Sequence, residues 1–241
     1  MRTSRIFTDQ SLSPGKEAVL NEATGRYITQ VLRMRPGQSL ILFDGSGLDY
    51  EASLKQSDRR ACTVQVIRVL ADEPPPPIQV HLGIGISRGE RMDFAIQKSV
   101  ELGVSAITPL FTMRGVVQLK ADRLAKRMVH WRGVIHSACE QSGRSRIPAL
   151  HTPLDLPDWL REWPSGFLLY HRAEQTLAGS PDPGDKPNLL IGPEGGLCES
   201  ERTLAVTSGY TAVRLGPRVL RTETAPLAAL ATIQALWGDF R

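Results

Sequence analysis

Hydrophobic and polar positions follow two different patterns along the chain. In the first 72 residues, apolar and polar residues alternate at residues 50–54 and 63–70, and residues 40–43 form a short apolar run that is followed by a turn signal, DGSG, at 44–47. Alternation with a period of two predicts half-buried strands. A short apolar run that ends at a turn is also typical of a strand. Residues 21–32 have helical spacing, with Val31 and Leu32 expected to face inward. This part therefore predicts a small, strand-rich domain with one helix.

From residue 78 onward, short apolar strands alternate with amphipathic helices. The strands are expected at residues 78–84, 106–110, 166–170, 189–191 and 212–215, and the helices at 91–102, 124–138, 201–208 and 227–237. Leu124, Met128, Trp131, Ile135 and Ala138 form one apolar stripe on the longest of these helices. Regular alternation of strand and helix predicts an α/β domain with a parallel sheet covered on both faces.

Four consecutive prolines, Pro74 to Pro77, separate the two patterns. A proline run cannot join a helix or a central strand, and it favours an extended spacer. We therefore predict an N-terminal domain at residues 1–72, a linker at 73–77 and a second domain at 78–241.

Composition narrows the class of protein without naming a function. The chain has 241 residues, of which 41% are hydrophobic and 22% are charged, as in ordinary globular proteins. No apolar run is long enough to cross a membrane, and the N-terminus lacks the apolar core of a secretory signal. Three widely spaced cysteines argue against a disulfide frame or a structural zinc site. We expect a cytoplasmic protein without a bound metal.

Positive charge concentrates in one stretch of the chain. Residues 114–146 hold eight Lys or Arg against two acidic residues, although the net charge of the whole chain is only +4. Such an excess raises a local field that attracts phosphate groups. A basic, solvated helix face with no partner gives the same pattern, and sequence alone does not separate the two.

Two glycine-containing segments follow predicted strands, and both break local rules. Residues 189–196 read LLIGPEGG, and residues 215–224 read LGPRVLRTET. Glycines at the carboxyl ends of parallel strands let the backbone approach a ligand closely. The second segment also ends in Thr222 and Thr224, either of which could cap the last helix. These two loops are the candidate binding site.

Other ligand motifs fit poorly. The chain has no phosphate-binding P-loop, no nucleophile elbow and no histidine spacing typical of a metal site. The segment 83–89, GIGISRG, has the wrong glycine spacing for a dinucleotide loop, and Glu101 lies inside a predicted helix rather than after a second strand.

The two loops resemble the signature segments of the RsmE family. Three further stretches resemble the same family in the same order: VLR at 31–33 with LFDG at 42–45, SRGERM at 87–92 with QKSVELGV at 97–104, and ACEQSGR at 138–144. The family consists of SPOUT-class enzymes that use S-adenosylmethionine to make 3-methyluridine in 16S rRNA. The resemblance implies a small PUA-like RNA-binding β-barrel, followed by a SPOUT domain with a deep trefoil knot, usually assembled as a homodimer.

The resemblance also implies a set of site residues. The residues expected to bind the cofactor are Leu169, His171, Ile191, Gly192, Pro193, Glu194, Gly195, Gly196, Leu215, Gly216, Leu220, Arg221 and Thr222. The residues expected to bind 16S rRNA in the 30S subunit are Arg33, Arg35, Arg123, Arg127, Gln141, Arg144 and Arg146.

Methylation at N3 requires loss of a weakly acidic imide proton, which leaves negative charge on two uracil carbonyl oxygens. A cation near those oxygens stabilises the transition state, and Arg88 and Arg221 are the candidates. Glu194, Glu223, Glu140 or solvent could accept the proton. We take Arg88, Arg221 and Glu194 as the candidate catalytic residues.

Two alternatives remain open, and two positions depart from the family pattern. A non-catalytic RNA-binding assembly factor would keep the basic face, and a related enzyme could instead modify a ribose hydroxyl or a tRNA. Tyr27 stands where relatives often have His, and Pro226 stands at the start of the last helix. A proline is tolerated there only within the first turn, so we expect the helix to begin no earlier than about Glu223.

Overall fold

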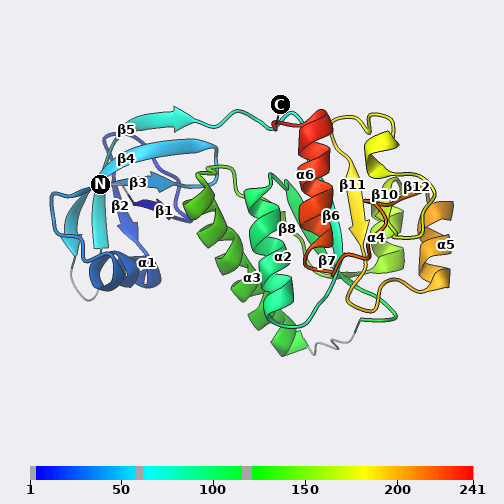
Figure 1. The fold of residues 1–241 in the computed structure, drawn as a ribbon. Helices are drawn as coiled ribbons and strands as arrows, with labels where there is room; N and C mark the ends of the chain where they lie inside the picture. The colour runs from blue at the N-terminus through cyan, green and yellow to red at the C-terminus, as the bar shows by residue number, and fades with distance from the viewer. Residues whose placement is uncertain (1–3, 58–61, 116–120, 241) are drawn as a thin grey trace. The chain divides into compact units, whose positions relative to one another are not determined.

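A computed structural model describes residues 4–57, 62–115 and 121–240 (Figure 1). The chain divides into two compact units. The N-terminal unit comprises residues 1–75 together with 139–147, and the C-terminal unit comprises residues 76–138 and 148–241. Residues 139–147 thus belong to the first unit, although they lie well beyond the proline linker in sequence.

The N-terminal unit is built on a five-stranded sheet. Its strands are β1 (Arg5–Phe7), β2 (Glu17–Leu20), β3 (Ser39–Phe43), β4 (Leu48–Ser57) and β5 (Cys62–Asp72), in the order β1-β3-β4-β5-β2. Strand β1 runs parallel to β3, and the other pairs are antiparallel. The three predicted strands are confirmed as β3, β4 and β5. The short strands β1 and β2 were not predicted, because neither has a long enough alternating pattern.

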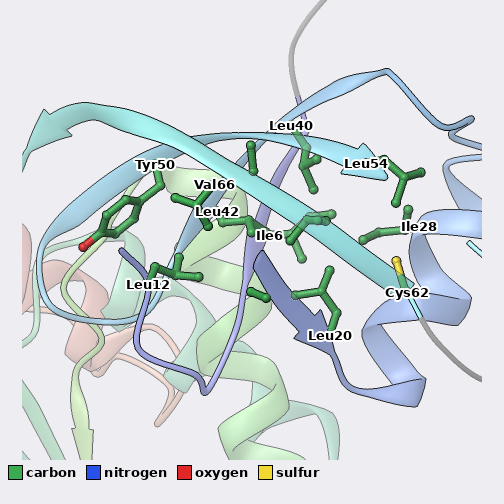
Figure 2. Close-up of a cluster of buried hydrophobic side chains, with 13 residues drawn as sticks. Ile6, Leu12, Leu20, Ile28, Leu40, Leu42, Tyr50, Leu54, Cys62 and Val66 are labelled. Carbon is green, nitrogen blue, oxygen red and sulfur yellow. The ribbon is translucent and has the colours of Figure 1, made fainter. Parts of the chain in front are cut away.

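Apolar side chains of β3, β4 and β5 lie in the core of this unit, together with residues of β1 and β2 (Figure 2). Leu40 and Leu42 of β3 pack with Leu54 of β4 and Val64 of β5. The predicted helix begins as α1 (Glu22–Arg26) and continues as a π-helix, η1 (Tyr27–Val31). The prediction that Val31 faces inward is wrong, since its side chain is 66% exposed. The wider π-helical turn changes which residues share a face, and it is Ile28 that is fully buried.

Residues 139–147 attach to the N-terminal unit through a network of polar contacts. Arg5 forms a two-point ion pair with Asp49, with Nη2 2.7 Å from Oδ1 and Nε 3.3 Å from Oδ2. The same guanidinium donates to the backbone oxygen of Cys139 and to Oγ of Ser145. The backbone N–H of Phe7 donates to Oε1 of Glu140 at 3.0 Å. This short segment therefore completes the first unit.

The C-terminal unit contains a seven-stranded parallel sheet. The strands are β6 (His81–Gly85), β7 (Ala106–Phe111), β8 (Ala149–Leu150), β9 (Leu154–Asp155), β10 (Gly166–Leu169), β11 (Asn188–Ile191) and β12 (Tyr210–Val213). Six follow the order β12-β10-β11-β6-β7-β8, and β9 also pairs with β7. The predicted α/β class and parallel sheet are confirmed. Strand β11 lies between β10 and β6, so the chain turns back on itself within the sheet.

Helices cover both faces of this sheet. They are α2 (Glu90–Glu101), α3 (Ala121–Ser142), α4 (Leu156–Glu162), α5 (Glu199–Thr207), α6 (Ala225–Trp237) and the 3₁₀ turn η2 (Leu177–Gly179). Neighbouring residues of a strand point to opposite faces. In β10, Leu168 packs in a cluster with α4 and α5, whereas the ring of Phe167 stacks on Trp237 of α6. Helix α6 in turn packs against α2.

The predicted helices and their ends are largely as expected. The α3 stripe is confirmed, with Met128, Trp131, Ile135 and Ala138 all buried. Gly103 ends α2 with a positive φ of 83°. Pro226 lies in the first turn of α6, where a proline is tolerated. No helix in the described part of the chain is long and apolar enough to span a membrane.

Candidate active site

Loops at the carboxyl ends of β10, β11 and β12 enclose a cavity in the C-terminal unit. Its volume is about 470 Å³. The walls come from the end of β10, the loop between β11 and α5, and the loop between β12 and α6. Ligands of parallel α/β sheets bind at this end of the strands. The two loops singled out in the sequence thus meet at one site.

Direct contacts lock these loops to each other and to the loop that follows β6. Oγ1 of Thr222 donates to the carbonyl oxygen of Gly192 at 3.1 Å, which joins the β12–α6 loop to the β11–α5 loop. The hydroxyls of Ser87 and Thr222 lie 3.3 Å apart. The backbone N–H of Arg88 donates to Oε1 of Glu194 at 3.0 Å. Three loops far apart in sequence are therefore held in one arrangement.

Glycine is required where these loops cross. A side chain at Gly85 would lie 2.4 Å from Pro193, so the two loops could not approach as they do. A side chain at Gly192 would lie 2.9 Å from the backbone nitrogen of Leu197. Gly85, in the segment 83–89 that is a poor match to a dinucleotide loop, therefore allows close packing of the chain.

Glu194 is held as a carboxylate. Burial alone would raise its pKa, but hydrogen bonds from its own and the Arg88 backbone N–H groups and from the Ser87 hydroxyl, together with the nearby charge of Arg91, lower the pKa below its ordinary value. An Nη1 of Arg91 lies 3.5 Å from Oε1 of Glu194. The contacts of Glu194 fix the backbone of Arg88, which makes Glu194 a brace for the loop that carries a candidate catalytic residue.

Six arginines line the cavity, and four of them are engaged with the protein. Besides Arg91, Arg114 donates to the carbonyl oxygen of Gly195 at 3.2 Å. Arg214 donates to the carbonyl oxygens of Ala173 and Glu174 at 2.8 and 3.0 Å.

Arg202, the fourth, donates to the carbonyl oxygen of Leu197 and lies over the ring of Tyr170. The side chains of Arg218 and Arg221 form no hydrogen bond or ion pair within the described residues, and both are exposed. The cavity therefore has a braced set of arginines and a pair that remains available.

Most residues predicted to bind the cofactor lie on this cavity. The lining residues among them are Leu169, His171, Ile191, Gly192, Pro193, Glu194, Gly195, Gly196, Leu215, Leu220, Arg221 and Thr222. Gly216 is not part of the lining, but its φ of 118° turns the loop that carries Leu220 and Arg221. Arg88 is exposed and outside the lining; its backbone reaches the site through Glu194.

The structure separates Glu140 from the other two carboxylates considered as proton acceptors. Glu140 belongs to the N-terminal unit, where it accepts from Phe7, and burial raises its pKa. Glu194 and Glu223 both line the cavity. Oε2 of Glu223 is buried and has no hydrogen-bond partner among the described residues.

Sequence reasoning missed four arginines of the wall, Arg91, Arg114, Arg202 and Arg214. Arg114 follows β7 and Arg214 follows β12, so their position at strand ends was a usable signal. Arg91 and Arg202 are on helices, and nothing local distinguishes them from solvated arginines.

The residues predicted to bind RNA are spread over both units. Arg33 and Arg35 lie in the N-terminal unit, and Arg33 has a left-handed backbone with φ of 52°. Arg123 and Arg127 are on α3, while Gln141, Arg144 and Arg146 belong to the segment that completes the N-terminal unit. Lys120, part of the same basic stretch, lies outside the described residues.

Arg146 has a structural contact of its own. Its Nε donates to the carbonyl oxygen of Glu73 at 2.8 Å, and its backbone N–H donates to the Glu73 carboxylate at 2.7 Å. Arg146 therefore braces the beginning of the linker, and its contact with RNA stays a prediction. Within the described ranges, no group of three or more His, Cys, Asp or Glu side chains could hold a metal ion.

Comparisons with known proteins match both units. Residues 74–234 match the family model described as an RNA methyltransferase domain, and residues 20–67 match the model described as an RNA methyltransferase PUA domain. The ribosomal RNA small subunit methyltransferase E of Buchnera aphidicola subsp. Schizaphis graminum is 32% identical, covering 99% of this chain and 98% of its own. The protein of that name from Bacillus subtilis is 28% identical, covering 98% and 99%.

Solved structures extend the likeness to three dimensions. A Legionella pneumophila protein in complex with S-adenosylmethionine is 38% identical, with a TM-score of 0.96 and full coverage of both chains. The ribosomal RNA small subunit methyltransferase E of Neisseria gonorrhoeae, bound to S-adenosylmethionine, is 36% identical with a TM-score of 0.92, again over both whole chains. The chain therefore belongs to the RNA methyltransferase family whose members include ribosomal RNA small subunit methyltransferase E, the RsmE family.

Proposed function

We propose that this protein transfers a methyl group from S-adenosylmethionine to N3 of a specific uridine in the 16S rRNA of the small ribosomal subunit. The observation that carries the proposal is the cavity formed by the interlocked β11–α5 and β12–α6 loops, because the family's signature segments make up its walls. Family membership over the whole chain supports the same reaction.

The cavity is suited to this cofactor. Its wall combines apolar side chains, such as Leu169, Ile191 and Leu220, with backbone groups of the glycine-rich loop. An apolar surface accommodates an adenine ring, and exposed backbone groups can pair with its polar edge and with the ribose. Bound S-adenosylmethionine would supply an electrophilic methyl group on a sulfonium.

The protein's own residues would prepare the uracil ring for transfer. Arg221 lines the cavity with a guanidinium that no described residue engages, so it can approach the uracil carbonyl oxygens and stabilise the charge that develops there. Glu194 holds the Arg88 backbone, which positions Arg88 as the second candidate for that role. Holding the ring in line with the methyl donor supplies a large share of the rate.

Two finer features of the proposal concern architecture. The return of β11 between β6 and β10 is consistent with the knotted SPOUT topology expected from the family. A homodimer is consistent with α6, whose residues Ala235 and Leu236 are exposed despite the helix's apolar sequence. A dimer at micromolar concentration in sedimentation velocity supports this assembly, and a monomer argues against it.

The RNA would be held by positive charge in both units. Arg33 and Arg35 are exposed in the PUA-like unit, and Arg123 is exposed on α3. Replacing Arg123 and Arg127 together by alanine should weaken RNA binding and reduce its salt dependence, because each lost phosphate contact removes about one released counterion.

Nucleoside analysis tests the proposed reaction. The protein is incubated with S-adenosylmethionine and either 30S subunits or protein-free 16S rRNA, both from cells that lack the modification, and the digested RNA is analysed by mass spectrometry. We expect N3-methyluridine, and the comparison of substrates shows whether an assembled subunit is needed. A 2′-O-methylated nucleoside would indicate the ribose-modifying alternative. Binding without any methyl transfer would indicate an assembly factor.

A further inference from the structure

The cavity wall carries more positive charge than the binding of S-adenosylmethionine requires. Six arginines line it against two glutamates, Glu194 and Glu223. S-adenosylmethionine has a net charge of +1, because its sulfonium and ammonium groups outweigh its carboxylate. A surplus of guanidinium groups therefore repels the cofactor as a whole. The surplus instead matches a polyanion, and RNA carries one negative charge at every nucleotide.

Arg218 is the one arginine of the cavity wall for which neither a contact nor a role has yet been described. Four of the arginines are bound to carbonyl oxygens or to Glu194 and serve to hold the walls together. Arg221 is already placed at the uracil carbonyls by the proposed mechanism. Arg218 remains, with an exposed side chain that no described residue engages.

The loop that carries Arg218 is fixed at both ends and open at its tip. On one side, the Arg214 side chain and backbone bond to residues 173–177. On the other side, Thr222 bonds to Gly192. At the tip, next to Arg218, Val219 is 72% exposed. Anchoring at both ends limits the backbone entropy that the tip loses on binding, so the main entropic cost is that of ordering the Arg218 side chain.

We propose that Arg218 binds a backbone phosphate next to the target uridine; this inference rests on the proposed function. N3 lies on the base-pairing edge of uracil, so the base must be unpaired and turned into the cavity before transfer. A nucleotide that enters the cavity brings its flanking phosphates to the rim. A guanidinium can hold a phosphate through two parallel hydrogen bonds. Arg218 is therefore a substrate-binding residue, distinct from Arg221 at the base.

The test compares Arg218→Ala with Arg172→Ala, a matched control. Arg172 is an exposed arginine of the same unit that lies outside the cavity wall. Binding of undermethylated 30S subunits is measured over a range of salt concentrations, methyl transfer is measured by steady-state kinetics, and S-adenosylmethionine binding is measured by calorimetry.

For Arg218→Ala we expect KM for the 30S subunit to rise about tenfold, as for a lost hydrogen bond to a charged group. The slope of log affinity against log salt is negative, and its magnitude should fall by roughly 0.7 to 0.9, the value for one phosphate. Affinity for S-adenosylmethionine should not change, and Arg218→Lys should recover part of the loss. Arg172→Ala should behave as wild type.

Weaker binding of S-adenosylmethionine by Arg218→Ala with an unchanged salt slope would overturn the proposal, since Arg218 would then bind the cofactor's carboxylate. An RNA affinity and slope equal to wild type would overturn it as well. The binding measurement does not depend on the reaction: absence of N3-methyluridine with the wild-type protein would refute the proposed function, whereas the slope of Arg218→Ala decides the role of this residue.

Discussion

The family-like segments of this chain fall into two groups with very different roles in the structure. The segments 189–196 and 215–224 form the walls of a cavity, whereas the segment 138–144 ends a helix and helps to complete the N-terminal unit. In the first, Glu194 and Arg221 lie where a ligand would bind. In the second, Glu140 accepts a hydrogen bond from Phe7 and is absent from the cavity. Resemblance to a family thus marks constrained residues, and the constraint can be architectural as well as chemical.

Among the variants that test this contrast, the largest effect, a loss of turnover, is expected at Arg221. In Arg221→Lys the charge remains but the planar fork is lost, and turnover should fall about 100-fold, the typical cost of removing one preorganised donor. Melting temperature and S-adenosylmethionine affinity should stay close to wild type. Arg161→Lys, an exposed position on α4, is the control.

A loss of melting temperature and cofactor affinity in Arg221→Lys would instead make Arg221 a brace, which would place it with Glu140 in the comparison. Unchanged turnover would remove Arg221 from the mechanism and leave Arg88 as the candidate.

A smaller effect, on stability alone, is expected where residues 139–147 attach. Asp49→Ala leaves Arg5 without its partner in a pair whose side chains are only 13% and 15% exposed. Urea denaturation should show a loss of about 2–3 kcal/mol, because a largely buried charge is left uncompensated. Glu51→Ala on the same strand breaks an exposed pair with Arg68 and should cost less than about 1 kcal/mol.

S-adenosylmethionine affinity should be the same in both of these variants. If Asp49→Ala reduced cofactor affinity without reducing stability, the contrast between segment 138–144, which supports the fold, and the segments that form the cavity would be wrong.

The smallest effect is expected at His81, the first residue of β6. His81 is buried, with Nε2 2.7 Å from Oγ1 of Thr108 and its ring against Trp163. Burial, together with the neighbouring His151, lowers its pKa to about 4 from an ordinary 6.5. The folded state therefore disfavours protonation, so the stability that neutral His81 contributes is present above pH 6.5 and is lost as the pH falls toward 4.

Between pH 6.5 and 4.5, wild type should lose about 2 kcal/mol more stability than His81→Gln, as measured by urea denaturation at each pH. Parallel stability curves for the two proteins would contradict this assignment. Methyl transfer at neutral pH should be unaffected, because His81 is not part of the cavity wall.

Local patterns predicted much of the fold because they report local geometry. The stripe on α3, the strands β6 and β11, and the glycine that ends α2 all follow from spacing within a few residues. The strand ends also located the two loops of the cavity. Where the local rule was ambiguous the prediction failed: Val31 shares the spacing of a helix, but a π-helical turn exposes it.

By itself, the sequence determined the alternation of strands and helices and the two loops from which the site is built, because each depends on neighbouring residues. Only the tertiary structure decided that residues 139–147 complete the N-terminal unit, that Arg91, Arg114, Arg202 and Arg214 meet around one cavity, and that Glu140 lies outside it. These outcomes depend on contacts between segments many residues apart. Such contacts are selected by the packing and charge balance of the whole fold, and they leave no periodic signal in the chain.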